Sequence, residues 1–222
     1  MTRLASATEA AHTGLQIRRL GEIAYQDAFE LQEELRNRHL AGRGRDTVLL
    51  LEHPDVITFG RGAEAGTALL SEAGLRAQGY DVHRVNRGGD VTYHGPGQLV
   101  GYPILDLKRH GRDVHLYLRT LEQALIACLA RFEIAALCRP GFAGVWLDER
   151  HKIASIGVGV RRWVTLHGFA LNVNCDLSRF APIIPCGLEG VEMVSMESVI
   201  GVEVALEPVL RATAEELEKV FA

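Results

Sequence analysis

Apolar positions spaced three or four residues apart predict three main helices in this chain. Gly42 and Gly44 are expected to end the first helix, Asp113 to cap the second, and Pro208 to mark the start of the last. A shorter helix is expected over 68–78. The inner faces of the main helices are Ala24, Ala28, Leu31 and Leu35, then Val114, Leu118, Leu121, Leu125, Leu129 and Phe132, and finally Leu210, Ala214, Leu217 and Phe221.

Runs of β-branched and alternating apolar residues predict strands between these helices. The expected strands are 47–52, 56–59, 81–85, 98–107, 143–147, 152–160 and 164–172. The last two are joined by a turn near Arg161–Arg162. Because strands and helices do not alternate regularly, we predict an α+β fold with a mixed, largely antiparallel sheet. Residues 15–222 are expected to form this single domain, after a disordered tail over 1–14.

Composition and charge narrow the class of protein. The chain has 222 residues, of which 47% are hydrophobic, and this is enough for one sizeable core. It contains no apolar run near the ~20 residues of a membrane span, and the first residues do not read as a signal peptide. We therefore expect a cytoplasmic protein with no membrane contact. A net charge of −4 argues against nucleic acid as a partner. The four cysteines and nine histidines show no metal-binding spacing, so no metal is expected.

The segment Arg87–Gln98, RGGDVTYHGPGQ, is the most informative stretch of the sequence. Its four glycines and one proline disfavour a helix or a central strand. Such a loop lets backbone N–H groups approach a ligand closely. A simple turn between Val85 and Leu99 is the alternative. The polar side chains among the glycines favour a binding loop.

The segment His151–Asn174 contains two predicted strands with unusual residues. Lys152 begins an otherwise apolar strand, where a buried ammonium needs a partner or a task. The alternative is a lysine that reaches solvent at the strand edge. The small and apolar residues of Ser155–Gly157 and Gly168–Ala170 either wall a slot for an acyl chain or are close-packing points.

Cys186, in the segment PIIPCGL, is the cysteine placed like a nucleophile. It lies between a proline and a glycine, which indicates a loop with little bulk beside the sulfur. Cys128 and Cys138 read as structural thiols. Cys175 is also read as structural, because the charge of the neighbouring Asp176 opposes thiolate formation.

Together these segments resemble the lipoyl (octanoyl) transferase family, and Glu52–Ala63, EHPDVITFGRGA, resembles a further family segment. The resemblance runs from about Leu49 to Ile200. It implies the fold of biotin and lipoate protein ligase catalytic domains, an acyl-thioester on Cys186 and Lys152 as its activating partner. One departure is Val194, where the family commonly has threonine. The positions that match substrate contacts in the family are Arg87, Gly88, Gly89, Asp90, Val91, Thr92, Tyr93, His94, Ser155, Ile156, Gly157, Gly168, Phe169 and Ala170.

The resemblance also implies a reaction and its partners. An octanoyl group would pass from octanoyl-acyl carrier protein to a lysine of another protein, the first step of protein lipoylation, without a cofactor. The implied acceptors are lipoyl domains of 2-oxoacid dehydrogenases and the glycine cleavage H protein. We expect the acidic carrier to dock on local arginines, either Arg36, Arg38, Arg43 and Arg45 or Arg161 and Arg162.

Three other functions fit parts of the pattern. A lipoate or biotin ligase on the same fold would require ATP. A cysteine thioesterase would pair Cys186 with His94 or His167 and would use water as acceptor. A carrier-binding domain without catalysis would bind the donor but form no acyl-enzyme.

Overall fold

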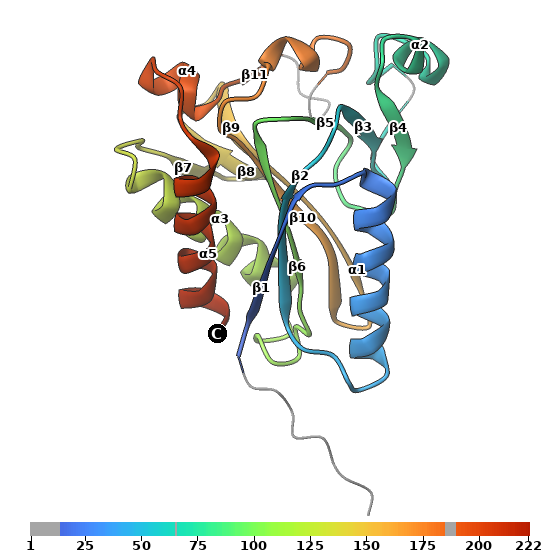
Figure 1. The fold of residues 1–222 in the computed structure, drawn as a ribbon, viewed down its shortest axis with the longest axis vertical. Coiled ribbons are helices and arrows are strands. Elements are labelled where there is room, and N and C mark those ends of the chain that lie inside the picture. Colours follow the sequence, from blue (N-terminus) through green and yellow to red (C-terminus); the bar gives the residue numbers. More distant parts are fainter. Residues whose placement is uncertain (1–13, 65, 185–189) are drawn as a thin grey trace, which may run out of the picture.

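A computed structural model describes residues 14–64, 66–184 and 190–222 of the chain, and an eight-stranded sheet runs through its centre (Figure 1). The β1–β2 and β9–β11 pairs are parallel and the remaining pairs are antiparallel, so the prediction of a mixed, largely antiparallel sheet is confirmed. The strand order is β1 (Gln16–Glu22), β2 (Thr47–Glu52), β6 (Gln98–Ile104), β10 (Val164–Asn172), β9 (His151–Arg161), β8 (Phe142–Trp146) and β7 (Leu137–Arg139), with β11 (Glu192–Met193) paired to β9.

Helices cover both faces of this sheet, as Figure 1 shows. Successive side chains of a strand point to opposite faces, and β2 is apolar on both. Its Val48 and Leu50 belong to the core beneath two helices, whereas Leu49 and Leu51 belong to the core beneath one. The pair of helices is α3 (Val114–Ala130) and α5 (Leu206–Phe221), and the single helix is α1 (Tyr25–Leu40).

The predicted helix boundaries are largely confirmed. The Asp113 side chain accepts hydrogen bonds from the backbone N–H groups of His115 and Leu116, so it caps α3 as expected. Helix α1 ends at Leu40, just before Gly42 at a φ of +73°. The apolar pattern did not predict β1, β7, β11, α4 (Met196–Ile200) or the 3-10 helix η1 (Leu177–Phe180).

A second, three-stranded sheet lies beside the N-terminal end of α1, in the order β4 (Asp81–Arg84), β3 (Val56–Phe59) and β5 (Val91–His94). Helix α2 (Glu72–Ala77) connects β3 to β4. The expectation of a loop over all of Arg87–Gln98 is wrong in its middle, because β5 pairs with β3 there. The glycines flank these four residues, and β5 needs hydrogen-bond partners on one side alone because it is an edge strand.

Strands β9 and β10 form a long hairpin that carries much of the candidate site. Its turn is made by Arg162 and Trp163, both at positive φ (52° and 70°), as in the two-residue turns that match the twist of a hairpin. The predicted turn is therefore confirmed within one residue. Pairing of the two strands brings Ser155 opposite Ala170, three residues after Lys152 along β9.

Candidate active site

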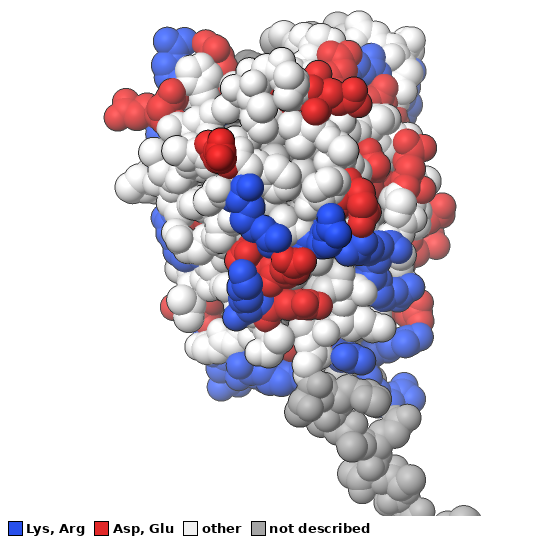
Figure 2. Space-filling view, turned by 60° about the vertical axis from the view of Figure 1, so that its left-hand side comes forward, with Lys and Arg blue, Asp and Glu red and all other residues white. Residues whose placement is uncertain are grey.

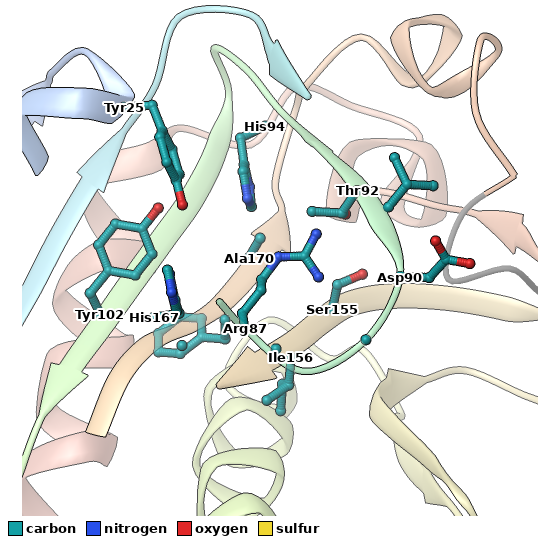
Figure 3. Close-up of a pocket in the computed structure, with 15 residues that line it drawn as sticks. Tyr25, Arg87, Asp90, Thr92, His94, Tyr102, Ser155, Ile156, His167 and Ala170 are labelled. Carbon is teal, nitrogen blue, oxygen red and sulfur yellow. The ribbon is translucent and has the colours of Figure 1, made fainter. Parts of the chain in front are cut away.

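A cavity that is partly open to solvent lies between the β9–β10 hairpin and the segment that follows Arg87 (Figure 3). Every substrate contact predicted from the sequence lines this cavity except Gly88 and Tyr93. The lining residues are Tyr25, Arg87, Gly89, Asp90, Val91, Thr92, His94, Tyr102, Ser155, Ile156, Gly157, His167, Gly168, Phe169 and Ala170.

The two small-residue segments form one wall because they are paired across the hairpin. Gly157 lies opposite Gly168 and Ile156 opposite Phe169. A Cβ on Gly157 would come within 3.0 Å of the carbonyl oxygen of Gly88. This glycine therefore lets the Arg87 segment approach β9 closely. The two small-residue segments both pack closely against their neighbours and line the cavity.

Arg87 holds the glycine-rich segment against the small sheet. Its buried guanidinium donates to the carbonyl oxygen of Thr58 at 2.7 Å and to the Thr58 hydroxyl at 3.0 Å. The next residue, Gly88, donates its N–H to the carbonyl oxygen of Val158 on β9 at 2.8 Å. These contacts join the small sheet to the large one and fix one side of the cavity.

One end of the cavity is lined by polar rings that are uncharged at neutral pH. Figure 3 shows the Tyr25 and Tyr102 hydroxyls directed toward one another, with His94 and His167 beside them. Burial raises the pKa of Tyr25 to about 12 and raises that of Tyr102 well above its usual value. Burial, followed by the charge of Arg87, lowers the pKa of His167 to about 3. No local motif marked the two tyrosines, which come from α1 and β6.

His94 is held by a chain of buried side-chain amides. Its Nδ1 donates to Oε1 of Gln98 at 2.7 Å, and Nε2 of Gln98 donates to Oδ1 of Asn172 at 2.8 Å. Nδ2 of Asn172 then donates to the carbonyl oxygen of Val194 at 2.9 Å. The N–H of Val194 donates to the carbonyl oxygen of Lys152 at 3.0 Å. Val194, the residue that departs from the family pattern, therefore has both its backbone N–H and its backbone carbonyl in hydrogen bonds.

Several polar atoms that line the cavity are buried and have no hydrogen-bond partner among the described residues. They are Oδ1 of Asp90, Oγ of Ser155 and Nε2 of His167. Buried polar groups in folded proteins are nearly always paired, so unpaired ones in a cavity need an explanation. Hydrogen-bond partners for these three atoms would come from a bound molecule or from water.

Lys152 is buried rather than extended to solvent, with 2% of its surface exposed. Its Nζ donates to the carbonyl oxygen of Ala143 at 3.0 Å and lies 4.9 Å from the centre of the Trp146 ring. The alternative of a lysine that reaches solvent is therefore wrong. Lys152 precedes the Ser155 wall of the cavity by three strand residues, or roughly 10 Å.

Cys186, the predicted nucleophile, lies outside the described residues. The other three thiols are disfavoured as nucleophiles. Burial raises the pKa of Cys175 to about 12, and the charge of Asp176 adds to the effect. Burial also raises the pKa of Cys128 and of Cys138. These cysteines fit the structural role expected from the sequence.

On the α3–α5 side, the charged side chains of the described residues do not form one large patch of a single sign. Figure 2 shows basic and acidic side chains intermixed near the centre of the face it presents. Two ion pairs involve α5, one between Arg131 and Glu215 and one between Arg19 and Glu207. In the described ranges no group of three acidic, histidine or cysteine side chains could hold a metal ion, and no helix is long and apolar enough to cross a membrane.

Two of the arginines expected to dock a carrier line one groove. Arg36 and Arg161 line a groove at the other end of the β9–β10 hairpin, which His167 separates from the cavity. Arg36 also forms an ion pair with Glu33 on its own helix. The docking of a carrier on these arginines stays a prediction.

Comparison with known proteins places the chain in a family. The model of the lipoyl protein ligase A/B catalytic domain matches residues 24–218. An octanoyltransferase of Geotalea uraniireducens is 52% identical over 182 residues, which are 82% of this chain and 81% of that protein. The chain belongs to the lipoyl protein ligase A/B catalytic-domain family.

Solved structures agree with the fold of this family. A putative lipoate protein ligase from T. acidophilum superposes with a TM-score of 0.69 at 18% identity, covering 93% of this chain and 85% of that one. A biotin protein ligase from Aquifex aeolicus superposes with a TM-score of 0.51 at 13% identity, covering 93% and 68%. The expected likeness to lipoate and biotin ligase catalytic domains is confirmed.

Proposed function

We propose that this family member is a cytoplasmic octanoyltransferase that moves an octanoyl group from octanoyl-acyl carrier protein to a lysine of lipoyl domains. Proteins named octanoyltransferase are 52% identical to it over 182 residues and 50% identical over 200 residues. The acceptors are the lipoyl domains of 2-oxoacid dehydrogenases and the glycine cleavage H protein. The observation that carries the proposal is a cavity walled by the three segments expected to contact substrate, with the buried Lys152 three residues before one of these segments on β9.

The cavity supplies the parts that binding an acyl chain requires. Ile156, Phe169 and Ala170 offer an apolar wall, and the glycines leave room beside it. The carbonyl carbon of the acyl chain lies at the Lys152 end and its terminal methyl points toward His167. Three strand residues, roughly 10 Å, separate the Ser155 and Val158 positions along β9, which suits an extended chain of about eight carbons.

The first half of the reaction loads the enzyme. Lys152 takes the proton of the Cys186 thiol, and the resulting thiolate attacks the carbonyl carbon of the donor thioester. A new carbon–sulfur bond to Cys186 forms while the bond to the carrier's sulfur breaks. The carrier thiolate leaves and receives its proton from the Lys152 ammonium.

The second half transfers the acyl group. The neutral amine of the acceptor lysine attacks the Cys186 thioester, and its extra proton passes to Lys152. The amide bond forms and Cys186 leaves as a thiolate, which restores the ammonium–thiolate pair. The histidines are poorly suited to this base role, because the pKa of His94 and that of His167 are each lowered to about 3, chiefly by burial.

The test is the mass of the intact protein after mixing with octanoyl-carrier protein and no acceptor. One octanoyl group should be added, and hydroxylamine should remove it, because hydroxylamine cleaves a thioester and spares an amide. Cys186→Ser should abolish the adduct, whereas Cys128→Ser and Cys175→Ser should keep it. An adduct that persists in Cys186→Ser would contradict the mechanism.

Transfer to an apo lipoyl domain should then proceed without ATP, which separates this function from a ligase. Free octanoate should not accumulate in the absence of acceptor, which separates it from a thioesterase. Lys152→Ala should slow both half-reactions and slow alkylation of Cys186 by iodoacetamide at neutral pH, since the thiolate loses its ammonium partner. Equal alkylation rates in the two proteins would remove Lys152 from this role.

A further inference from the structure

The backbone of β8 forms a close-fitting support for the Lys152 side chain. Nζ of Lys152 donates to the carbonyl oxygen of Ala143 at 3.0 Å. Gly144, at a φ of +125°, has no side chain beneath the lysine, and a Cβ there would lie 2.6 Å from Cε of Lys152. The lysine side chain therefore packs directly against the peptide group that joins Ala143 to Gly144.

A buried carboxylate binds the other side of the same peptide group. Oε1 of Glu122 on α3 accepts the N–H of Gly144 at 3.0 Å, and Glu122 is 1% exposed. The carbonyl of Ala143 and the N–H of Gly144 belong to one peptide unit, so it connects Glu122 to Lys152. A carboxylate on the N–H polarises the carbonyl and makes its oxygen a stronger acceptor for an ammonium.

We propose that Glu122 is a positioning residue for Lys152, which it orients and stabilises as an ammonium through the Ala143–Gly144 peptide. Its catalytic meaning rests on the function proposed above, but the link between the two side chains does not. The negative charge of Glu122 favours the charged form of Lys152 and holds Nζ at the Ala143 carbonyl. Arg119 forms an ion pair with the second oxygen of Glu122 and offsets this effect.

Other ionisable groups near Lys152 are left in place in the variants compared below. Cys138 lies beside Glu122, and its pKa is raised by burial first and then by that carboxylate. The guanidinium of Arg139 lies 5.0 Å from the centre of the same Trp146 ring that Lys152 contacts. Further charged groups lie where β9 begins and where β11 pairs with it, namely Arg150, His151 and Glu192.

The experiment follows the titration of Lys152 by NMR, with ¹³C in the lysine ε position and Lys152→Arg to assign the signal. Glu122→Gln keeps an oxygen that accepts the Gly144 N–H but removes the charge. The titration midpoint of Lys152 should move to lower pH, because a negative charge near the ammonium is lost. Arg119→Gln, at a half-exposed position, should move it to higher pH. Glu216→Gln is the matched control. Glu216 is also a buried carboxylate paired with an arginine, Arg131, but it lies on α5 and its pair is at the C-terminal end of α3.

Opposite shifts in Glu122→Gln and Arg119→Gln, with none in Glu216→Gln, would support the link. A purely structural glutamate predicts no shift in Glu122→Gln, and that result, or shifts of the same sign in both variants, would overturn it. If Glu122→Gln does not fold, an unchanged midpoint in Arg119→Gln overturns the proposal by itself. Because the titration requires no substrate, it separates failure of this link from failure of the octanoyltransferase assignment.

Discussion

Nδ1 of His94 donates to Oε1 of Gln98 across 2.7 Å, and this contact fixes which nitrogen of the ring faces the cavity. With the proton on Nδ1, Nε2 is an acceptor. Figure 3 shows the ring directed into the cavity. Burial, followed by the charge of His53, lowers the pKa of His94 to about 3. His94 therefore offers a lone pair to a bound molecule and does not exchange protons near neutral pH.

We predict that His94 keeps this neutral tautomer when the pH falls from 7 to 5. His151 is the internal comparison, because its hydrogen bond to Asp148 raises its pKa. Ring ¹⁵N shifts in a histidine-labelled sample should show His151 protonated at pH 5 while His94 stays unprotonated at Nε2. A His94 titration with its midpoint above pH 5 would mean that the ring is more hydrated than its burial indicates.

Stability should decrease over the same pH range. Burial lowers the pKa of His53 to about 4, and those of His94 and His167 lie at about 3, so the unfolded chain takes up protons that the folded chain does not. The contribution of these three histidines to the free energy of unfolding is complete above ~6.5, the pKa of an unfolded histidine. It is lost as the pH falls toward their pKa values in the folded protein, by up to about 2 kcal/mol each between pH 7 and pH 5.

Urea unfolding at the two pH values measures this loss. His167→Asn, which tolerates the positive φ of 59° at that position, should lose less stability than the wild type over the same interval. Equal losses in the variant and the wild type would mean that His167 does not contribute to the pH dependence of stability.

We predict that His167 limits the length of the acyl chain. Its ring separates the cavity from the groove that contains Phe29 and Val160. His167→Gly removes this wall without backbone strain. Each further buried methylene is worth about 0.8 kcal/mol, so kcat/KM for decanoyl relative to octanoyl donor should rise roughly 10-fold.

Val160→Ala is the matched control, because it changes the groove and leaves the wall in place. It should keep the wild-type preference. A His167→Gly enzyme with the same preference as the wild type would place the end of the acyl chain elsewhere.

We predict that Tyr93 has a structural role instead of the substrate contact that the family resemblance implied. Its hydroxyl donates to Oδ1 of Asp55 at 2.7 Å, and its ring packs edge-on against Phe180. Tyr93→Phe should therefore lower the free energy of unfolding by about 1–2 kcal/mol and leave KM for the donor within about twofold. A tenfold rise in KM with unchanged stability would restore the binding role.

The sequence determined those features that depend on neighbouring residues. The periodicity of apolar positions predicted α1, α3, α5 and the β9–β10 hairpin, because burial of one face repeats with the geometry of the element. The motifs also selected nearly all the cavity residues. Strands such as β1 and β7 gave no such signal, because short or exposed edge strands carry little apolar alternation.

Only the tertiary structure decided which distant residues meet. Tyr25 and Tyr102 reach the cavity because α1 packs on one face of β6 and β10, a result of strand order that no local pattern contains. Tyr93 turns away because strand side chains alternate, so it faces the small core when His94 faces the cavity. Glu122 and Lys152 are 30 residues apart and are joined by a peptide of a third segment. Pairing of β8 with β9 and packing of α3 on the sheet bring this peptide between them.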